Sequence, residues 1–225
     1  MSQNVESIKY KFVLLGDSSV GKTAIFSRLS GKSFNESQLS IIGTERIIVN
    51  FDNVEINSDE QIIKNFKITL FDTAGQERYR AITKSFFKGS QGIILIYSII
   101  DETSFEHIEV WLDSIKESLS DWKSSGYIVM LLGNKLDITE EKLESRVILT
   151  EEAQRICNEH GIYWGGECSA KTFSKNQIKG IFIEFIKQIY SKLGDENMNN
   201  DEHGRQFSIK FSYAKKKRVC CLAAY

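Results

Sequence analysis

The chain has 225 residues, a formal net charge of −1 and four cysteines. Its length suits one α/β domain with an extension, and its near-neutral charge provides no overall basic field for nucleic acid. The cysteines do not form a secreted disulfide framework, no N-terminal stretch resembles a signal peptide, and no apolar run reaches the ~20 residues of a membrane span. We therefore expect a cytosolic, monomeric protein without a nucleic-acid partner.

Short β-branched runs alternate with longer amphipathic segments, which is the pattern of strands and crossover helices. We predict a single doubly wound α/β domain with a mostly parallel six-stranded sheet and helices on both faces. The predicted strands are 9–15, 46–53, 64–71, 92–98, 127–132 and 162–167, and the predicted helices are 22–30, 103–119, 150–160 and 174–193. The polar stretch 53–61 predicts a surface hairpin excursion.

The ends of the chain differ in composition from its middle. Residues 1–7 are expected to be a flexible N-terminus and residues 8–193 the folded domain. From Gly194 the chain becomes acidic and polar and loses its apolar periodicity, so residues 194–225 are expected to be a disordered tail.

A complete G-x-x-x-x-G-K-[ST] phosphate loop follows the first predicted strand and begins a helix. It consists of Gly16, Asp17, Ser18, Ser19, Val20, Gly21, Lys22 and Thr23, and the predicted nucleotide contacts extend to Ala24. Its glycines allow backbone N–H groups to point at phosphate oxygens, with the positive end of the helix behind them. Lys22 is expected to reach the β- and γ-phosphates, and the Thr23 hydroxyl to ligate Mg²⁺.

A second candidate site segment begins at Asp72, after the third predicted strand and at the same edge of the sheet as the phosphate loop. Asp72 is expected to hold Mg²⁺ through water, and Gly75 to bring a backbone N–H close to a γ-phosphate. Gln76 is the predicted catalytic residue, because its side chain can orient an attacking water.

Two further segments predict guanine recognition. Asp137 can accept two hydrogen bonds from the guanine edge, whereas adenine would leave buried polar atoms unpaired. Lys135 is expected to lie along the base, and Asn134 to connect this loop to the phosphate loop. The remaining predicted contacts are Ser169, Ala170 (through its backbone N–H), Lys171 and Phe34, which covers the base edge. Cys168 is expected to pack as a small hydrophobe, and the three histidines to be surface or tail residues without metal-ligand spacing.

These segments, in this order, resemble the Ras superfamily and most closely the Rab GTPases of vesicle traffic. The resemblance covers about residues 8–193 and resumes at the tail, and it is most specific in Leu70-Phe71-Asp72-Thr73-Ala74-Gly75-Gln76-Glu77-Arg78. It implies a small-GTPase type of P-loop fold and the roles given above for the lysine, threonine, aspartate and glutamine. It also implies a GTP-bound state that binds effectors and a GDP-bound state that is extracted from membranes.

The first switch departs from the Rab pattern. Rab proteins usually have Ser-Thr-Ile-Gly here, and their threonine ligates Mg²⁺, but this chain has Ile41 at that place. Isoleucine has no oxygen for a hard cation. Three consequences remain open: Ser40 or Thr44 supplies the oxygen after a register slip, a water fills the site, or the switch orders only weakly on GTP.

A second departure is Arg46, where Rab proteins usually have a phenylalanine of the apolar effector patch. Phe71 and Phe86 keep the other two aromatic positions. One interpretation is that a cation at the rim changes which effectors fit. The other is that Arg46 lies on the solvent face of a strand.

The tail carries two membrane signals. Lys215-Lys216-Lys217-Arg218 precedes adjacent Cys220 and Cys221, which resemble the double-geranylgeranylation sites of Rab proteins. Leu222 is fourth from the end, so a C-a-a-X farnesylation box is absent. Two lipid chains, or one chain with a basic patch, are sufficient for stable anchoring.

Together these features predict a Rab-like small GTPase that binds GTP and GDP with Mg²⁺, hydrolyses GTP and regulates vesicle traffic at the cytoplasmic face of an intracellular membrane, with a cytosolic pool. Its expected partners are an exchange factor, a GTPase-activating protein, a GDP dissociation inhibitor, an escort protein and effectors at both switches. The alternative hypothesis, motivated by Ile41, is a slowly cycling or hydrolysis-deficient guanine-nucleotide-binding scaffold.

Overall fold

The computed structural model describes residues 7–34, 44–57, 61–73, 87–119, 126–142 and 145–194. Within these ranges six strands form one sheet in the order β2-β3-β1-β4-β5-β6. The strands are β1 (Ile8–Leu15), β2 (Thr44–Asn57), β3 (Ile62–Thr73), β4 (Gly92–Ser98), β5 (Ile128–Asn134) and β6 (Tyr163–Glu167). Only the β2–β3 pair is antiparallel, so the predicted mostly parallel six-stranded sheet is confirmed.

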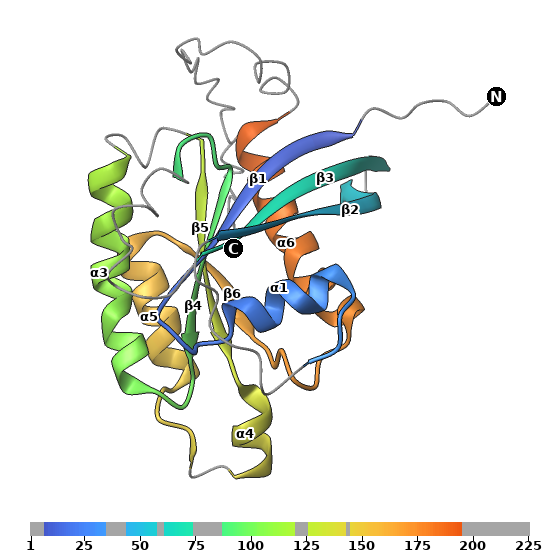
Figure 1. Ribbon diagram of the computed structural model, residues 1–225. Coiled ribbons are helices and arrows are strands. Elements are labelled where there is room, and N and C mark those ends of the chain that lie inside the picture. Colours follow the sequence, from blue (N-terminus) through green and yellow to red (C-terminus); the bar gives the residue numbers. More distant parts are fainter. Residues whose placement is uncertain are drawn as a thin grey trace, which may run out of the picture.

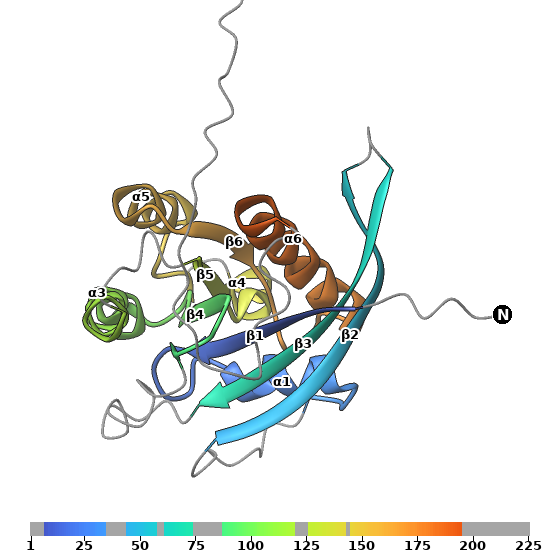
Figure 2. The same ribbon diagram turned by 90° about the horizontal axis from the view of Figure 1, so that it is seen from above.

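Helices cover both faces of this sheet. They are α1 (Lys22–Ser30), α3 (Glu102–Ser118), α4 (Leu136–Glu141), α5 (Thr150–His160) and α6 (Lys175–Leu193). Figure 1 shows α3 and α5 on one side of the sheet and α1 and α6 on the other. The view from above shows the twist of the sheet towards the long β2–β3 pair (Figure 2).

Successive side chains of β1 point to opposite faces of the sheet and so enter two separate hydrophobic cores. Phe12 and Leu14 belong to the core that packs against α1 and α6, whereas Val13 and Leu15 belong to the core that packs against α3 and α5. All four side chains are fully buried. A strand buried on both faces has a continuous apolar sequence, which is why this segment was recognisable as a central strand.

Residues 53–61 lie in a β-hairpin, as predicted, but the two strands of this hairpin are longer than predicted. β2 continues to Asn57 and β3 begins at Ile62, so most of this polar stretch is strand. Val54 is buried and Ile56 packs against the core, and this alternation stabilises the extension. The pairing register shifts between Phe51 and Val54, where the Asn53 N–H donates to Asn65 Oδ1 at 2.7 Å.

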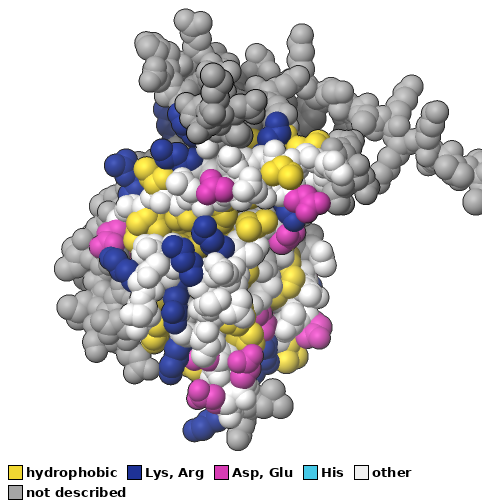
Figure 3. Space-filling view, turned by 90° about the vertical axis from the view of Figure 1, so that its right-hand side faces the viewer, with side chains coloured by type: hydrophobic (Ala, Val, Ile, Leu, Met, Phe, Trp, Pro, Cys, Tyr) yellow, Lys and Arg dark blue, Asp and Glu magenta, His cyan; other side chains and the backbone are white. Residues whose placement is uncertain are grey.

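The surface on the side of the β2–β3 pair is mixed in character. Lys and Arg side chains stand beside hydrophobic ones in the space-filling view (Figure 3). Ile48 of β2 is 55% exposed, and Arg46 is also exposed and pairs in register with Phe71 of β3. Arg46 therefore lies on the solvent face of its strand, and its effect on effectors stays a prediction.

Candidate functional site

The loop after β1, the end of β3 and the loops after β5 and β6 contain the predicted site residues. Because β1, β3, β5 and β6 are parallel to one another, their carboxyl ends meet at one edge of the sheet. The predictions for Gly75, Gln76, Ile41, Cys220 and Cys221 lie outside the described residues.

The phosphate loop packs closely against neighbouring segments at its two glycines. Gly16 has φ 131°, and a Cβ there would lie 2.1 Å from the carbonyl oxygen of Ile96. Gly21 has φ 100°, and a Cβ there would lie 2.1 Å from Nδ2 of Asn134. Both positions require glycine for conformation and for space.

Lys22 is buried at the mouth of this loop. Its Nζ donates to the carbonyl oxygens of Gly16 at 3.0 Å and Asp17 at 2.5 Å. Burial lowers the pKa of Lys22 to about 8, although the carboxylates of Asp72 and Asp17 oppose this shift. A phosphate oxygen bound here would add negative charge next to the ammonium group and would favour its charged form.

Asp72 is a buried carboxylate at the end of β3, and its side chain suits a hard cation. Neither of its oxygens has a hydrogen bond of normal geometry in the described part of the chain. Burial raises its pKa to about 6, against the opposing effects of the Thr23 hydroxyl and the Lys22 ammonium. A buried acceptor beside a hydroxyl fits Mg²⁺, which binds one or two protein oxygens together with substrate phosphates and water.

Asn134 joins the two halves of the site. Its Nδ2 donates to the carbonyl of Val20 in the phosphate loop at 2.8 Å, as predicted. Its Oδ1 accepts the N–H of Ala170 at 3.0 Å. A guanine carbonyl would therefore share the Ala170 donor with Asn134, which the sequence did not indicate.

Asp137 is held in place by Ser169. The Ser169 hydroxyl donates to Asp137 Oδ1 at 2.6 Å and accepts the N–H groups of Lys171 at 3.1 Å and Thr172 at 3.0 Å. Asp137 is 6% exposed and hydrogen-bonds through Oδ1 alone among the described residues. Its second oxygen is thus available to a ligand, while the first fixes the orientation of the carboxylate.

The remaining predicted base contacts are partly exposed. Lys135 begins the short helix α4 with a left-handed φ of 74°, and burial lowers its pKa. Phe34 is half-buried. Cys168 is fully buried and burial raises the pKa of its thiol to about 12, which agrees with its prediction as a small hydrophobe.

Two residues of α3 support the phosphate loop, a role that their positions in the sequence do not indicate. Nδ1 of His107 lies 2.5 Å from Oδ2 of Asp17, and Nε1 of Trp111 donates to Oδ1 of Asp17 at 2.8 Å. His107 is therefore more than a surface residue. The two rings are four residues apart, which places them on one face of the helix, but only the fold brings that face to the loop.

Two arginines bond to the segment that runs from Glu167, the last residue of β6, to Lys171 and is called the base loop below. Arg28 of α1 donates to the carbonyl oxygens of Ala170, at 2.8 Å, and Lys171. Arg146 forms a bidentate ion pair with Glu167, at 2.9 and 2.6 Å, and Thr150 adds a third bond to Glu167. Burial alone would raise the pKa of Glu167, but these bonds hold it below its usual value. No motif or spacing in the sequence marks either arginine as part of the site.

The strand order, the phosphate loop and the loops at one edge of the sheet define a P-loop protein of the small-GTPase type. Comparison with known proteins agrees with this class. The Ras family model matches residues 11–191. Ras-related protein Rab-13 of Mesocricetus auratus is 37% identical over 213 residues, covering 95% of this chain and 96% of the relative.

A plant relative is similarly close. Ras-related protein RABE1d of Arabidopsis thaliana is 33% identical over 215 residues, covering 94% of this chain and 91% of the relative. The chain belongs to the Ras family and, within it, to the Rab small GTPases. Members of this family are in general GTPases that use Mg²⁺ and act in membrane traffic.

Proposed function

We propose that this protein binds GTP and GDP with Mg²⁺, hydrolyses GTP, and regulates vesicle traffic at the cytoplasmic face of an intracellular membrane. The observation that supports this best is the Asn134 side chain, which bonds both the phosphate loop and the Ala170 loop. These two bonds join the phosphate loop to the loop in which Ser169 holds the Asp137 carboxylate, and this supports a single site for phosphates and base. The proposed nucleotide contacts come from the phosphate loop, from Asp72 and Gly75, from the loops that follow β5 and β6, and from Phe34.

The chemistry assigned to the chain is phosphoryl transfer to water. When bound, Mg²⁺ neutralises charge on the phosphates, and Thr23 and Asp72 are the residues that would hold it. Lys22 supplies a second positive charge from a buried position, where it acts more strongly than in water. Gln76 orients the attacking water, and an accelerating arginine would come from a GTPase-activating protein.

The membrane part of the proposal rests on the tail. Cys220 and Cys221 carry the lipids, and the basic run 215–218 adds attraction to anionic lipids. No helix in the described ranges is long and apolar enough to cross a membrane. The expected regulators are an exchange factor, a GDP dissociation inhibitor and an escort protein. Mass spectrometry of the protein from cells should show both cysteines prenylated, and two unmodified cysteines would contradict this part.

Single-turnover GTP hydrolysis tests the enzymatic part. We expect slow but measurable turnover by the wild type and faster turnover by Ile41→Thr, because threonine restores an oxygen ligand. Gln76→Leu serves as the control and should lose turnover while it keeps nucleotide. If the wild type shows no hydrolysis above buffer even with a matched activating protein, the scaffold alternative holds.

A further inference from the structure

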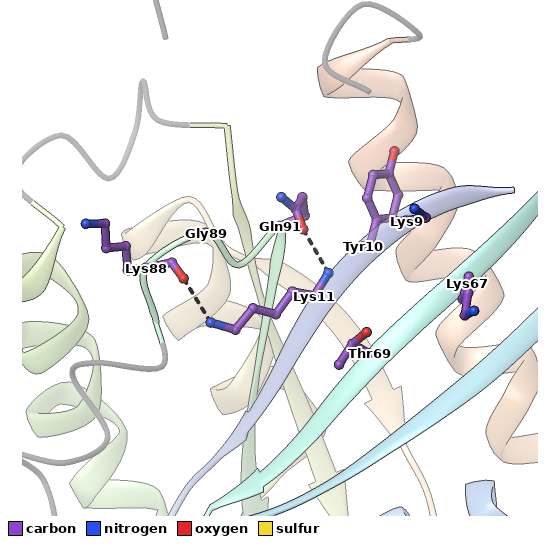
Figure 4. A pocket seen from close by; sticks show the side chains of 8 residues that line it. All are labelled: Lys9, Tyr10, Lys11, Lys67, Thr69, Lys88, Gly89 and Gln91. Atoms are coloured by element: carbon purple, nitrogen blue, oxygen red, sulfur yellow. Dashed lines mark hydrogen bonds between the residues drawn. The ribbon is translucent and has the colours of Figure 1, made fainter. Parts of the chain in front are cut away.

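A pocket of about 520 Å³ opens on the sheet, away from the nucleotide loops. Four of its eight lining residues are lysines, namely Lys9, Lys11, Lys67 and Lys88, and none is acidic. Figure 4 shows them on the first half of β1, the middle of β3 and the turn before β4. Lys9 and Lys67 are directly paired in the β1–β3 register, so their side chains leave the same face of the sheet.

No carboxylate among the described residues pairs with a lysine of this pocket. Lys9, Lys67 and Lys88 are exposed and form no ion pair in the described part of the chain. Lys11 is half-buried, and its Nζ donates to the Lys88 carbonyl at 2.8 Å and lies 5.3 Å from the centre of the Phe71 ring. Four ammonium groups around one pocket repel one another, so an acidic occupant would be stabilised there.

The end of α6 lies at the same edge of the molecule. Lys192 Nζ donates to the Tyr127 carbonyl at 3.2 Å, and the next residue, Ile128, donates its N–H to the carbonyl of Gln91 at 3.0 Å. Gln91 lines the pocket, and its side chain accepts the Lys11 N–H at 2.8 Å.

Acidic residues follow this helix immediately. Residues 195–202 contain Asp195, Glu196, Asp201 and Glu202, which is one carboxylate for each lysine of the pocket. The pocket opens on the face of the sheet opposite to α6, because Lys9 and Lys11 alternate with Tyr10 and Phe12, which pack against α6. Eight extended residues span about 26 Å, more than twice the ~10 Å between packed layers that the segment must pass. We propose that residues 195–202 dock in the lysine pocket of the same molecule.

This contact would fix the base of the tail against the sheet and leave residues 203–225 as the tether to the lipidated cysteines. It would also keep the pocket lysines from anionic membranes and from acidic partners. Because the segment is covalently attached, its effective concentration at the pocket is high. Each exposed ion pair is weak and screened by salt, so docking should be lost at high ionic strength. The proposal does not depend on GTP hydrolysis.

Zero-length carbodiimide cross-linking of the full-length, unlipidated protein tests this inference. At low salt we expect intramolecular cross-links from Lys9, Lys67 and Lys88 to carboxylates of residues 195–202. High salt should reduce them at least fivefold. The quadruple variant Asp195→Asn, Glu196→Gln, Asp201→Asn and Glu202→Gln should abolish them and should increase amide exchange of the β1 and β3 segments around the pocket about threefold.

A matched pair of lysine variants supplies the control. Lys9→Gln, Lys67→Gln and Lys88→Gln together should reproduce the faster exchange, because these exposed side chains are not needed for folding. Lys116→Gln, Lys142→Gln and Lys187→Gln, none of which lines the pocket, should leave exchange at the pocket unchanged. Cross-links spread evenly over distant carboxylates, or present only between two molecules, would overturn the proposal. So would phosphatidylserine vesicles binding the wild type through the pocket lysines as strongly as they bind the quadruple variant.

Discussion

The base side and the phosphate side of the site are built differently. On the base side, Asn134, Asp137 and Ser169 are already hydrogen-bonded to protein partners. On the phosphate side, burial shifts the pKa values of Lys22 and Asp72 against their charged forms, and the Asp72 oxygens have no hydrogen bond in the described part. The base side is thus preorganised for selection, whereas the phosphate side gains its full stability from the charges of the ligand.

The largest effect is expected at the preorganised base side. Asp137→Asn replaces a buried acceptor with an amide and should weaken GDP binding about 100-fold, or about 3 kcal/mol. Nucleotide dissociation kinetics measure this change. Glu140→Gln, on the exposed part of α4, should leave the dissociation rate unchanged. Equal effects of the two variants would mean that Asp137 does not recognise the base.

On the phosphate side, removal of a carboxylate should stabilise the protein when no ligand is bound. Because the pKa of Asp72 is raised, ionisation costs stability progressively from about pH 4 to pH 6, and the full cost is present at pH 7. Asp72→Asn should therefore raise the free energy of unfolding by about 2 kcal/mol without nucleotide and with EDTA.

With GDP and Mg²⁺ present, Asp72→Asn should instead lower the stability of the complex. Denaturant unfolding under both conditions measures the change of sign. Asp113→Asn, whose carboxylate is exposed on α3, is the control and should be neutral in both. A loss of stability under both conditions would show that Asp72 has a structural role on the phosphate side.

The ion pair behind the base loop allows a pH test of preorganisation. Arg146→Met leaves Glu167 without its partner and should cost about 2 kcal/mol at pH 7, since this pair is mostly buried. The pKa of Glu167 is lowered, so the stabilisation is present above about pH 4.5 and is lost as the pH falls through the folded-state pKa.

Urea unfolding at pH 7 and at pH 4 should show the difference between Arg146→Met and wild type becoming smaller at the lower pH. Lys187→Met, which removes an exposed pair with Glu184, should change stability by less than about 0.5 kcal/mol. A difference that is constant with pH would assign the effect to lost packing of the arginine stem.

The smallest effect is expected at the support of the phosphate loop. His107→Ala removes one of two ring donors to Asp17 and should speed GDP release about threefold, equivalent to about 0.6 kcal/mol. His160→Ala removes the bond to Glu109 on the other side of α3 and is the matched control. Its GDP release should equal that of the wild type. Equal rates for all three proteins would remove His107 from the site.

Prediction from the sequence succeeded where local backbone structure depends on neighbours in the chain. The phosphate loop and the Asn134 to Asp137 segment are contiguous, so their backbone geometry follows from local residue types. It made the two strands of the β2–β3 hairpin too short, because the alternation of Val54 and Ile56 was hidden among polar residues, and it missed α4, whose six residues are too few to show a period.

The sequence by itself determined the fold class, the family and the positions of the phosphate loop and the Asn134 to Asp137 segment, because strand alternation, helix periodicity and short motifs are local properties of the chain. Only the tertiary structure decided that His107 and Trp111 hold Asp17, that Arg28 and Arg146 support the base loop, and that four lysines share one pocket. Pairs such as Asp17 with Trp111, or Arg28 with Ala170, are 94 and 142 residues apart. Such contacts form only when the sheet order brings distant segments together, and no local pattern of residues records them.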